Sequence, residues 1–131
     1  MILLDTHALV WLAAEPTRLS RPAATAIRDV ARVGGLRIAT VTLWELAALF
    51  ARGRLQAVGP TADEIEAIVH ETAVEPVAIT PRIAAFAVEL PATFPADPAD
   101  RLIAATARVL GAPLVTRDTR IRASKAVQTI W

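Results

Sequence analysis

The sequence predicts an α/β fold in which helices cover both faces of a mostly parallel β-sheet. Short apolar runs of strand length alternate with segments whose apolar residues recur at helical spacing. This alternation is typical of parallel sheets, because a parallel connection needs a crossover helix. The 131 residues fit a single domain, residues 1–131, and the 54% hydrophobic content is ample for one core.

The chain begins with a predicted strand and two predicted helices. Residues 2–4 form a short apolar run that indicates a buried strand, and residues 8–14 follow as a helix. Ser20 is a favourable first residue for a second helix, and the glycines at positions 34 and 35 are typical of its end. A buried strand that leads into a helix is the first half of an α/β unit.

The middle of the chain repeats this pattern. Residues 37–41 predict a second strand, and Thr42 to Glu45 has the S/T-x-x-E form of a capping box for the next helix, which continues to Gly53. Residues 61–64 form another such box and open a further helix. Residues 76–79 then predict a third strand.

The last third contains the most clearly delimited helix. The Thr80-Pro81 pair predicts a helix start, and the prolines of residues 91–98 predict a loop. The following helix begins at Asp97 and ends at Gly111. Residues 113–116 then predict a buried strand, and 126–130 a final edge strand.

Composition excludes several classes of site. The chain has no cysteine and only two histidines, His7 and His70, which leaves too few ligands for a typical zinc site. No apolar run approaches the roughly 20 residues that a membrane span needs, and the N-terminus lacks a signal-peptide pattern. We therefore expect a soluble, cytoplasmic protein. Residues 117–125 are locally basic, which suits either a solvated surface or a phosphate-rich partner.

Four acidic residues occupy related positions in the predicted fold. Asp5 and Asp118 each follow a strand directly, and Glu45 follows one by a few residues. Asp100 lies in the first turn of the helix before the last buried strand. Ligands of parallel sheets bind at the carboxyl ends of the strands. We therefore expect these four carboxylates to converge on one edge of the sheet.

Each acid also has a purely structural explanation. Asp5 could cap its helix, Glu45 could complete the capping box that begins at Thr42, and the helix dipole favours Asp100. Asp97 has the strongest structural explanation, since it precedes a proline at a helix start. These explanations account for each acid alone but not for their joint placement.

The joint placement favours a metal site. Carboxylates that share a small space repel one another, and proteins tolerate this when a cation or a shared proton lies between them. Oxygen ligands suit Mg²⁺ or Mn²⁺ rather than zinc. Such ions can clamp a phosphodiester and activate a water molecule for attack. The pattern therefore indicates metal-assisted phosphodiester hydrolysis.

Several sequence blocks support this interpretation by resemblance. They are residues 4–11 (LDTHALVW), 43–47 (LWELA), 53–55 (GRL), 97–104 (DPADRLIA) and 114–118 (LVTRD), with Trp131 at the end. In order and spacing they resemble the PIN-domain ribonucleases of the VapC toxin type. The resemblance implies a PIN-like three-layer α/β/α fold and Mg²⁺-dependent endoribonuclease activity. It also implies a homodimer, and a small VapB-like antitoxin that inhibits this toxin of a type II toxin-antitoxin system.

The resemblance also assigns site residues. The acidic quartet of the family falls on four residues of this sequence, Asp5, Glu45, Asp100 and Asp118, while Asp97 matches an additional aspartate of a DPxDR subgroup. Our hypothesis is that Asp5 and Asp100 hold the principal metal ion. Glu45 would bind through water or orient the nucleophile, and Asp118 would complete the site or a second metal position.

Neighbouring side chains are candidates for supporting roles. Thr6, Thr42 and Thr116 could orient carboxylates, although capping and strand propensity explain them equally well. Arg101, Arg117 and Arg120 could contact phosphate, since a guanidinium group matches phosphate oxygens. Arg101 could instead pair with Asp97 or Asp5 as an internal brace. His7 is interpreted as structural, and His70 as a residue of a polar helix.

Several apolar residues of the first and third predicted helices fit either the core or a docking surface. Trp11, Trp44, Leu46, Leu49 and Phe50 are core candidates first, and any exposed part of them could receive an antitoxin helix.

Three other functions remain open. A receiver-type phosphoacceptor would need adjacent acids after the first strand and a lysine after a late strand, whereas the sole lysine is Lys125. The other two are a non-toxin RNA-processing nuclease of the PIN type and a non-catalytic RNA- or protein-binding module.

Overall fold

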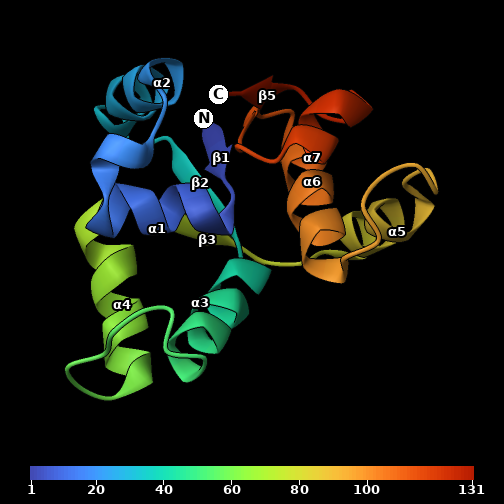
Figure 1. The fold of residues 1–131 in the computed structure, drawn as a ribbon. Coiled ribbons are helices and arrows are strands. Elements are labelled where there is room, and N and C mark those ends of the chain that lie inside the picture. Colours follow the sequence, from blue (N-terminus) through green and yellow to red (C-terminus); the bar gives the residue numbers. More distant parts are fainter.

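A five-stranded β-sheet lies between two layers of helices (Figure 1) in the computed structural model, which covers residues 1–131. All the strand pairs are parallel, in the order β3-β2-β1-β4-β5. The predicted three-layer α/β/α class is therefore confirmed, with a sheet that is entirely parallel. The strands are β1 (Ile2–Leu4), β2 (Leu36–Ala39), β3 (Glu75–Val77), β4 (Leu114–Val115) and β5 (Thr129–Ile130).

The helices divide between the two faces of the sheet. One layer contains α1 (Thr6–Ala14), α2 (Arg21–Ala31) and α4 (Thr61–Thr72), with a 3-10 turn, η1 (Pro16–Arg18), after α1. The other layer contains α5 (Pro81–Glu89), α6 (Pro98–Leu110) and α7 (Thr119–Ser124). Helix α3 (Val41–Ala51) begins just after β2 and packs against both α4 and α6. No helix is both long and apolar enough to cross a membrane.

The alternation of side chains along the strands builds the two halves of the core. Ile2 and Leu4 of β1 pack with α1 and α2 on one face, whereas Leu3 packs with α6 on the other. In β4, Leu114 and Val115 divide between the faces in the same way. Successive side chains of a strand point to opposite faces, so a strand buried on both faces must be apolar throughout.

Three of the predicted helix starts are confirmed by their capping contacts. The side chains of Ser20, Thr80 and Asp97 accept hydrogen bonds from backbone N–H groups three residues later. The predicted end of α6 is also confirmed, because Gly111 adopts φ 65°, a conformation that favours glycine. The loop at residues 91–97 lies where the prolines predicted it.

Two predicted capping boxes are wrong. Helix α3 begins at Val41, so Thr42 lies inside the helix and the strand before it is shorter than residues 37–41. At α4 the first cap position is Pro60, and Glu64 accepts hydrogen bonds from the preceding loop instead, at Val58 N and Gly59 N. In both places the S/T-x-x-E pattern is present, but the glutamate accepts from a group other than the predicted cap.

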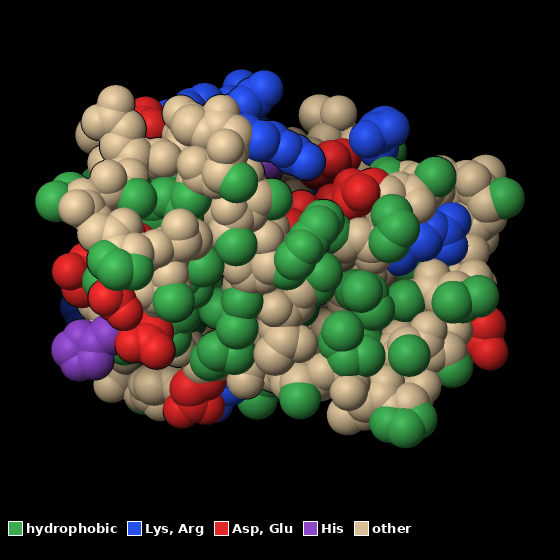
Figure 2. Space-filling view, turned by 90° about the horizontal axis from the view of Figure 1, so that it is seen from below, with side chains coloured by type: hydrophobic (Ala, Val, Ile, Leu, Met, Phe, Trp, Pro, Cys, Tyr) green, Lys and Arg blue, Asp and Glu red, His purple; other side chains and the backbone are tan.

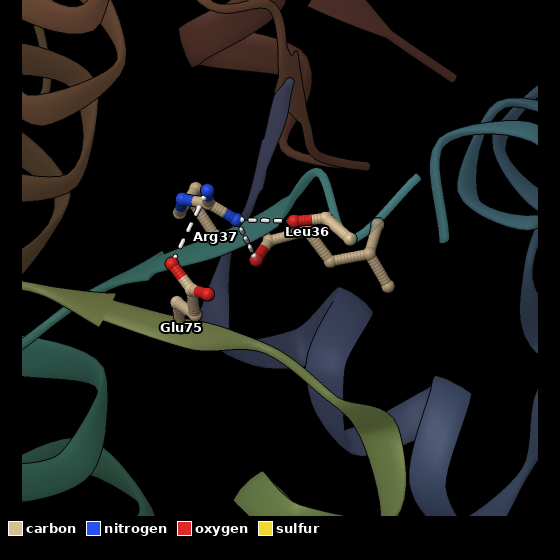
Figure 3. Close-up of polar contacts among 4 residues, drawn as sticks. Leu36, Arg37 and Glu75 are labelled. Carbon is tan, nitrogen blue, oxygen red and sulfur yellow. Dashed lines mark hydrogen bonds and ion pairs between the residues drawn. The ribbon is translucent and has the colours of Figure 1, made fainter. Parts of the chain in front are cut away.

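The pairing of β2 with β3 is reinforced by one side-chain contact (Figure 3). Arg37 on β2 forms an ion pair with Glu75 on β3, with 3.2 Å between Nη2 and Oε2. Its Nη1 also donates to the carbonyl groups of Gly34 and Leu36, at 2.8 and 3.0 Å. Because Arg37 and Glu75 are also backbone partners in the ladder, this contact supports the register of the sheet edge.

Arg101 connects the first turn of α6 to the end of α5 and the proline-rich loop. Its guanidinium group donates to five backbone carbonyl groups, at distances from 3.0 to 3.4 Å. The acceptors are Ala87, Leu90, Pro91, Phe94 and Pro95. The expected brace is therefore present, but its partners are carbonyl groups rather than the predicted Asp97 or Asp5. A guanidinium group used in this way has no donor left for phosphate, so the structure favours the brace over the predicted phosphate contact.

Replacing Arg101 tests this role. We expect Arg101→Ala to lower the free energy of unfolding by about 2–4 kcal/mol, because it leaves several partly buried carbonyl groups without a donor. Arg101→Lys should recover only part of the loss, since an ammonium group has three hydrogens and no planar fork. Urea denaturation measures both changes. Arg82→Ala, at an exposed position of α5, is the matched control, and an Arg101→Ala loss no larger than that of the control would contradict the brace.

Candidate active site

Four acidic side chains line one cavity of about 540 Å³ at the carboxyl edge of the sheet. Asp5 follows β1 and Asp118 follows β4, while Glu45 lies in α3 and Asp100 in the first turn of α6. The chain leaves β1 toward β2 and leaves β4 toward β5, so the cavity lies where the strand order reverses. The four acids thus converge as the sequence predicted. Acidic side chains gather beside basic ones in the view from below (Figure 2).

Asp5 is fixed between β4 and the start of α1. Its backbone N–H donates to Val115 O at 3.1 Å, and its Oδ1 accepts from Ala8 N at 2.7 Å, which caps α1. Burial raises the pKa of Asp5 above its usual value, although hydrogen bonds from Thr116 and Ala8 oppose the shift. The expected capping role is therefore real, and it also holds the carboxylate at the cavity.

Asp100 lies among other acidic groups. Burial and the negative charges around it raise its pKa to about 6, with Asp97 the largest charge contribution, followed by Asp118, Glu45 and Asp5. Asp97 itself caps α6, since its Oδ2 accepts from Asp100 N at 3.0 Å. Asp97 lines an adjacent cavity rather than the one that holds the quartet.

Glu45 is held by a threonine pair instead of a capping box. The Thr6 hydroxyl donates to Glu45 Oε1, and Thr6 and Thr42 share a hydrogen bond of 3.1 Å between their Oγ1 atoms. Both threonines are buried. The prediction that Thr6 and Thr42 orient a carboxylate is therefore supported by the hydrogen bond from Thr6 to Glu45 and by the bond between the two threonines.

Asp118 caps a helix that the sequence did not predict. Its Oδ1 accepts from the backbone N–H groups of Arg120 and Ile121, at 2.8 and 3.0 Å, and so begins α7. Its own N–H donates to Thr116 Oγ1 at 3.1 Å. Thr116 thus accepts from the backbone of Asp118 and its side chain lowers the pKa of Asp5, so it lies between the two residues that follow neighbouring strands.

The cations of the site lie at its rim without pairing with the acids. Arg117 and Arg120 line the cavity, and Arg117 lies over the Trp11 ring at 5.8 Å from its centroid. The ion pairs of the chain are Arg18 with Glu15 and Arg37 with Glu75, so no member of the quartet has a basic partner within 4.0 Å. Their mutual repulsion is therefore not neutralised by the protein.

The donor set fits a hard divalent cation. It offers carboxylate oxygens without cysteine or clustered histidine, which suits Mg²⁺ or Mn²⁺. No three of the acidic groups lie close enough to hold one ion directly in this arrangement. Magnesium usually binds proteins through one or two carboxylates and keeps several waters, so a widely spaced set of this kind is compatible with it.

Of two further residues near the site, Trp44 differs from expectation, and the structural interpretation of His7 stays a prediction. His7 is exposed and lines the cavity wall, with its ring tilted against Trp11. Trp44, expected in the core, is 64% exposed, whereas Trp11 and Leu46 are buried. The exposure of Trp44 could have been predicted from helical spacing. Thr42 and Leu46 define the inner face of α3, and a residue two positions from each points away from it.

The chain is similar to known proteins both in sequence and in structure. The PIN domain family matches residues 2–126. The chain is 42% identical over 132 residues to Ribonuclease VapC22 of Mycobacterium tuberculosis, covering 99% of this chain and 98% of that protein.

Solved structures share the fold at lower identity. VapBC2 from Rickettsia felis, bound to a promoter DNA fragment, superposes with a TM-score of 0.71 at 16% identity, over 98% of this chain and 97% of that chain. DNA-bound VapBC from Salmonella typhimurium gives a TM-score of 0.68 at 18% identity, over the same shares. The family match, the identity and the shared fold agree with the acidic cavity, and the chain therefore belongs to the PIN-domain family of VapC ribonucleases.

Proposed function

We propose that this protein is a Mg²⁺-dependent endoribonuclease that hydrolyses RNA phosphodiester bonds as the toxin of a VapBC-like toxin-antitoxin system. The observation that carries the proposal is the cavity in which Asp5, Glu45, Asp100 and Asp118 meet without a basic partner. The identity of 42% to a protein named as a ribonuclease supports the substrate class. Mn²⁺ would suit the same oxygen ligands.

The carboxylates have distinct roles in this proposal. Asp5 and Asp100 hold the principal ion, Asp118 completes the site, and Glu45 binds through water or orients the attacking water. Asp97 caps α6 and adds negative charge near Asp100. When bound, the ion would polarise the phosphodiester and lower the pKa of the attacking water.

Other residues hold these groups and the substrate in place. Thr6 fixes the orientation of Glu45, and Thr116 contacts both Asp5 and Asp118. Arg117 and Arg120 lie at the rim, where their guanidinium groups can bind the phosphates on either side of the scissile bond. The acidic interior thus selects the cation, and the basic rim attracts the RNA.

The proposed partners follow from the relatives. Two of the structurally similar proteins were solved as VapBC, which supports a VapB-like antitoxin for this chain, together with the homodimer that the family suggests. A non-catalytic binding module would retain the cation but cleave no RNA, and the first experiment below separates it from the enzyme.

Removing one charge from the quartet should abolish cleavage. We expect Asp5→Asn and Asp100→Asn each to reduce Mg²⁺-dependent cleavage of total RNA by about 100-fold or more, because each loses a ligand charge. Asparagine retains the shape of the side chain and can still cap α1. Circular dichroism checks the fold.

The matched control is Asp63→Asn, an exposed acid in the first turn of α4. It should cleave at the wild-type rate. Wild-type cleavage by both quartet variants would show that the assignment is wrong.

The raised pKa of Asp100 should also appear as a dependence of stability on pH. Its pKa rises from 3.8 to about 6 on folding, so the folded chain binds more protons between these values. The free energy of unfolding therefore falls as pH rises from about 4 to 6. Asp100→Asn removes this penalty, so without metal it should gain more stability over wild type at pH 8 than at pH 4. Urea denaturation in EDTA measures the difference, and an equal difference at both pH values would refute the shift.

The rim arginines should contribute to RNA affinity through their charge. We expect Arg117→Ala and Arg120→Ala each to reduce the slope of log affinity against log salt by about 0.7 to 1, the effect of one lost phosphate contact. Binding is measured with a non-cleavable 2′-O-methyl RNA. Arg122 is an exposed arginine of α7 that does not line the cavity, so Arg122→Ala should leave the slope unchanged. Equal slopes in all three variants and wild type would count against the contacts.

A further inference from the structure

A second cavity of about 300 Å³ adjoins the acidic one. The two share three wall residues, Thr6, His7 and Glu45, so a chain that passes through the first can continue into the second. The remaining wall comes mainly from α3 and the turn after it. It consists of Trp44, Ala48, Leu49, Arg52, Arg54 and Asp97.

Trp44 presents an aromatic surface in this second cavity. It is 64% exposed, although tryptophan is usually among the largely buried residues of a protein. It immediately precedes Glu45 in α3, which places the indole beside a wall that the two cavities share. An exposed aromatic ring next to a phosphodiester site is suited to stack on a base.

Arg52 and Arg54 provide free cations at the same cavity. Both are exposed, and neither forms an ion pair or a side-chain hydrogen bond within the chain. The two carboxylates of this cavity are engaged, because Glu45 accepts from Thr6 and Asp97 accepts from Asp100 N. The guanidinium groups of Arg52 and Arg54 therefore have unused donors, which match phosphate oxygens.

We propose that this second cavity binds the single-stranded RNA segment next to the scissile bond, with a base stacked on Trp44 and its phosphates on Arg52 and Arg54. The inference rests on the proposed function, since it takes the acidic cavity as the place of cleavage. A protein partner would also cover an exposed tryptophan. RNA is favoured because the aromatic ring, the free cations and the acidic cavity form one continuous surface.

Binding of non-cleavable RNA tests the stacking directly. With a panel of short single-stranded 2′-O-methyl RNAs, Trp44→Leu should weaken binding by about 5- to 100-fold, the range for loss of one stacked base. Trp44→Phe should keep most of the affinity, because it retains an aromatic face. The Arg52→Ala/Arg54→Ala double variant should show a shallower salt dependence. Fluorescence anisotropy measures all of these affinities.

A distant substitution serves as the control. Val88→Ala changes an exposed apolar residue of α5 outside both cavities and should bind RNA as wild type does. Wild-type affinity in Trp44→Leu would overturn the proposal. A Trp44→Leu protein that keeps its RNA affinity but changes its oligomeric state in sedimentation velocity would overturn it too, and would assign Trp44 to a protein interface.

The outcomes also separate this inference from the proposed hydrolysis. If wild type binds RNA through Trp44 but cleaves none with Mg²⁺, the hydrolysis proposal fails and the stacking site stands. If wild type cleaves RNA and Trp44→Leu binds it equally well, only the stacking site fails.

Discussion

The structure depends on holding several like charges together at one edge of a parallel sheet. Burial and the neighbouring acids raise the pKa of Asp100 to about 6, and burial raises that of Asp5, so the folded chain stores an unfavourable interaction. Helix starts offset part of it, because Asp5 and Asp118 accept backbone N–H groups at the beginnings of α1 and α7. No arginine or lysine pairs with the quartet, so the remaining charge is not neutralised within the chain. The same feature that weakens the fold therefore supports the proposed binding of a metal ion.

Much of this arrangement can be predicted from sequence because it depends on local or periodic signals. Side chains alternate between the two faces of a strand, so a strand that is buried on both faces must be apolar throughout. Residues 2–4 can be recognised as a strand for this reason. The beginning and end of α6 follow from Asp97 and Gly111, whose backbone preferences hold in any context. Once strands and helices alternate, parallel topology places Asp5 and Asp118 at one edge without further information.

What could not be predicted depends on contacts between distant segments. The sequence shows that Arg101 is a cation, but the convergence of five carbonyl groups on it exists only in the folded loop. Thr42 and Glu45 match a capping box, yet Thr6, thirty-nine residues from Glu45, uses that carboxylate instead. The short helix α7 was not predicted, because it is basic and has too few apolar residues to show helical periodicity. The exposure of Trp44 could have been inferred from its spacing to Leu46, had the inner face of α3 been fixed first.

The most direct test of the central claim is to locate the ion itself. A crystal of the protein grown with Mn²⁺ near pH 7.5 allows an anomalous difference map to be calculated at the metal edge. We expect a peak in the acidic cavity, bonded directly to oxygens of Asp5 and Asp100 or joined to them through ordered waters. Full Mn²⁺ occupancy at another surface site, with none between these carboxylates, would contradict it.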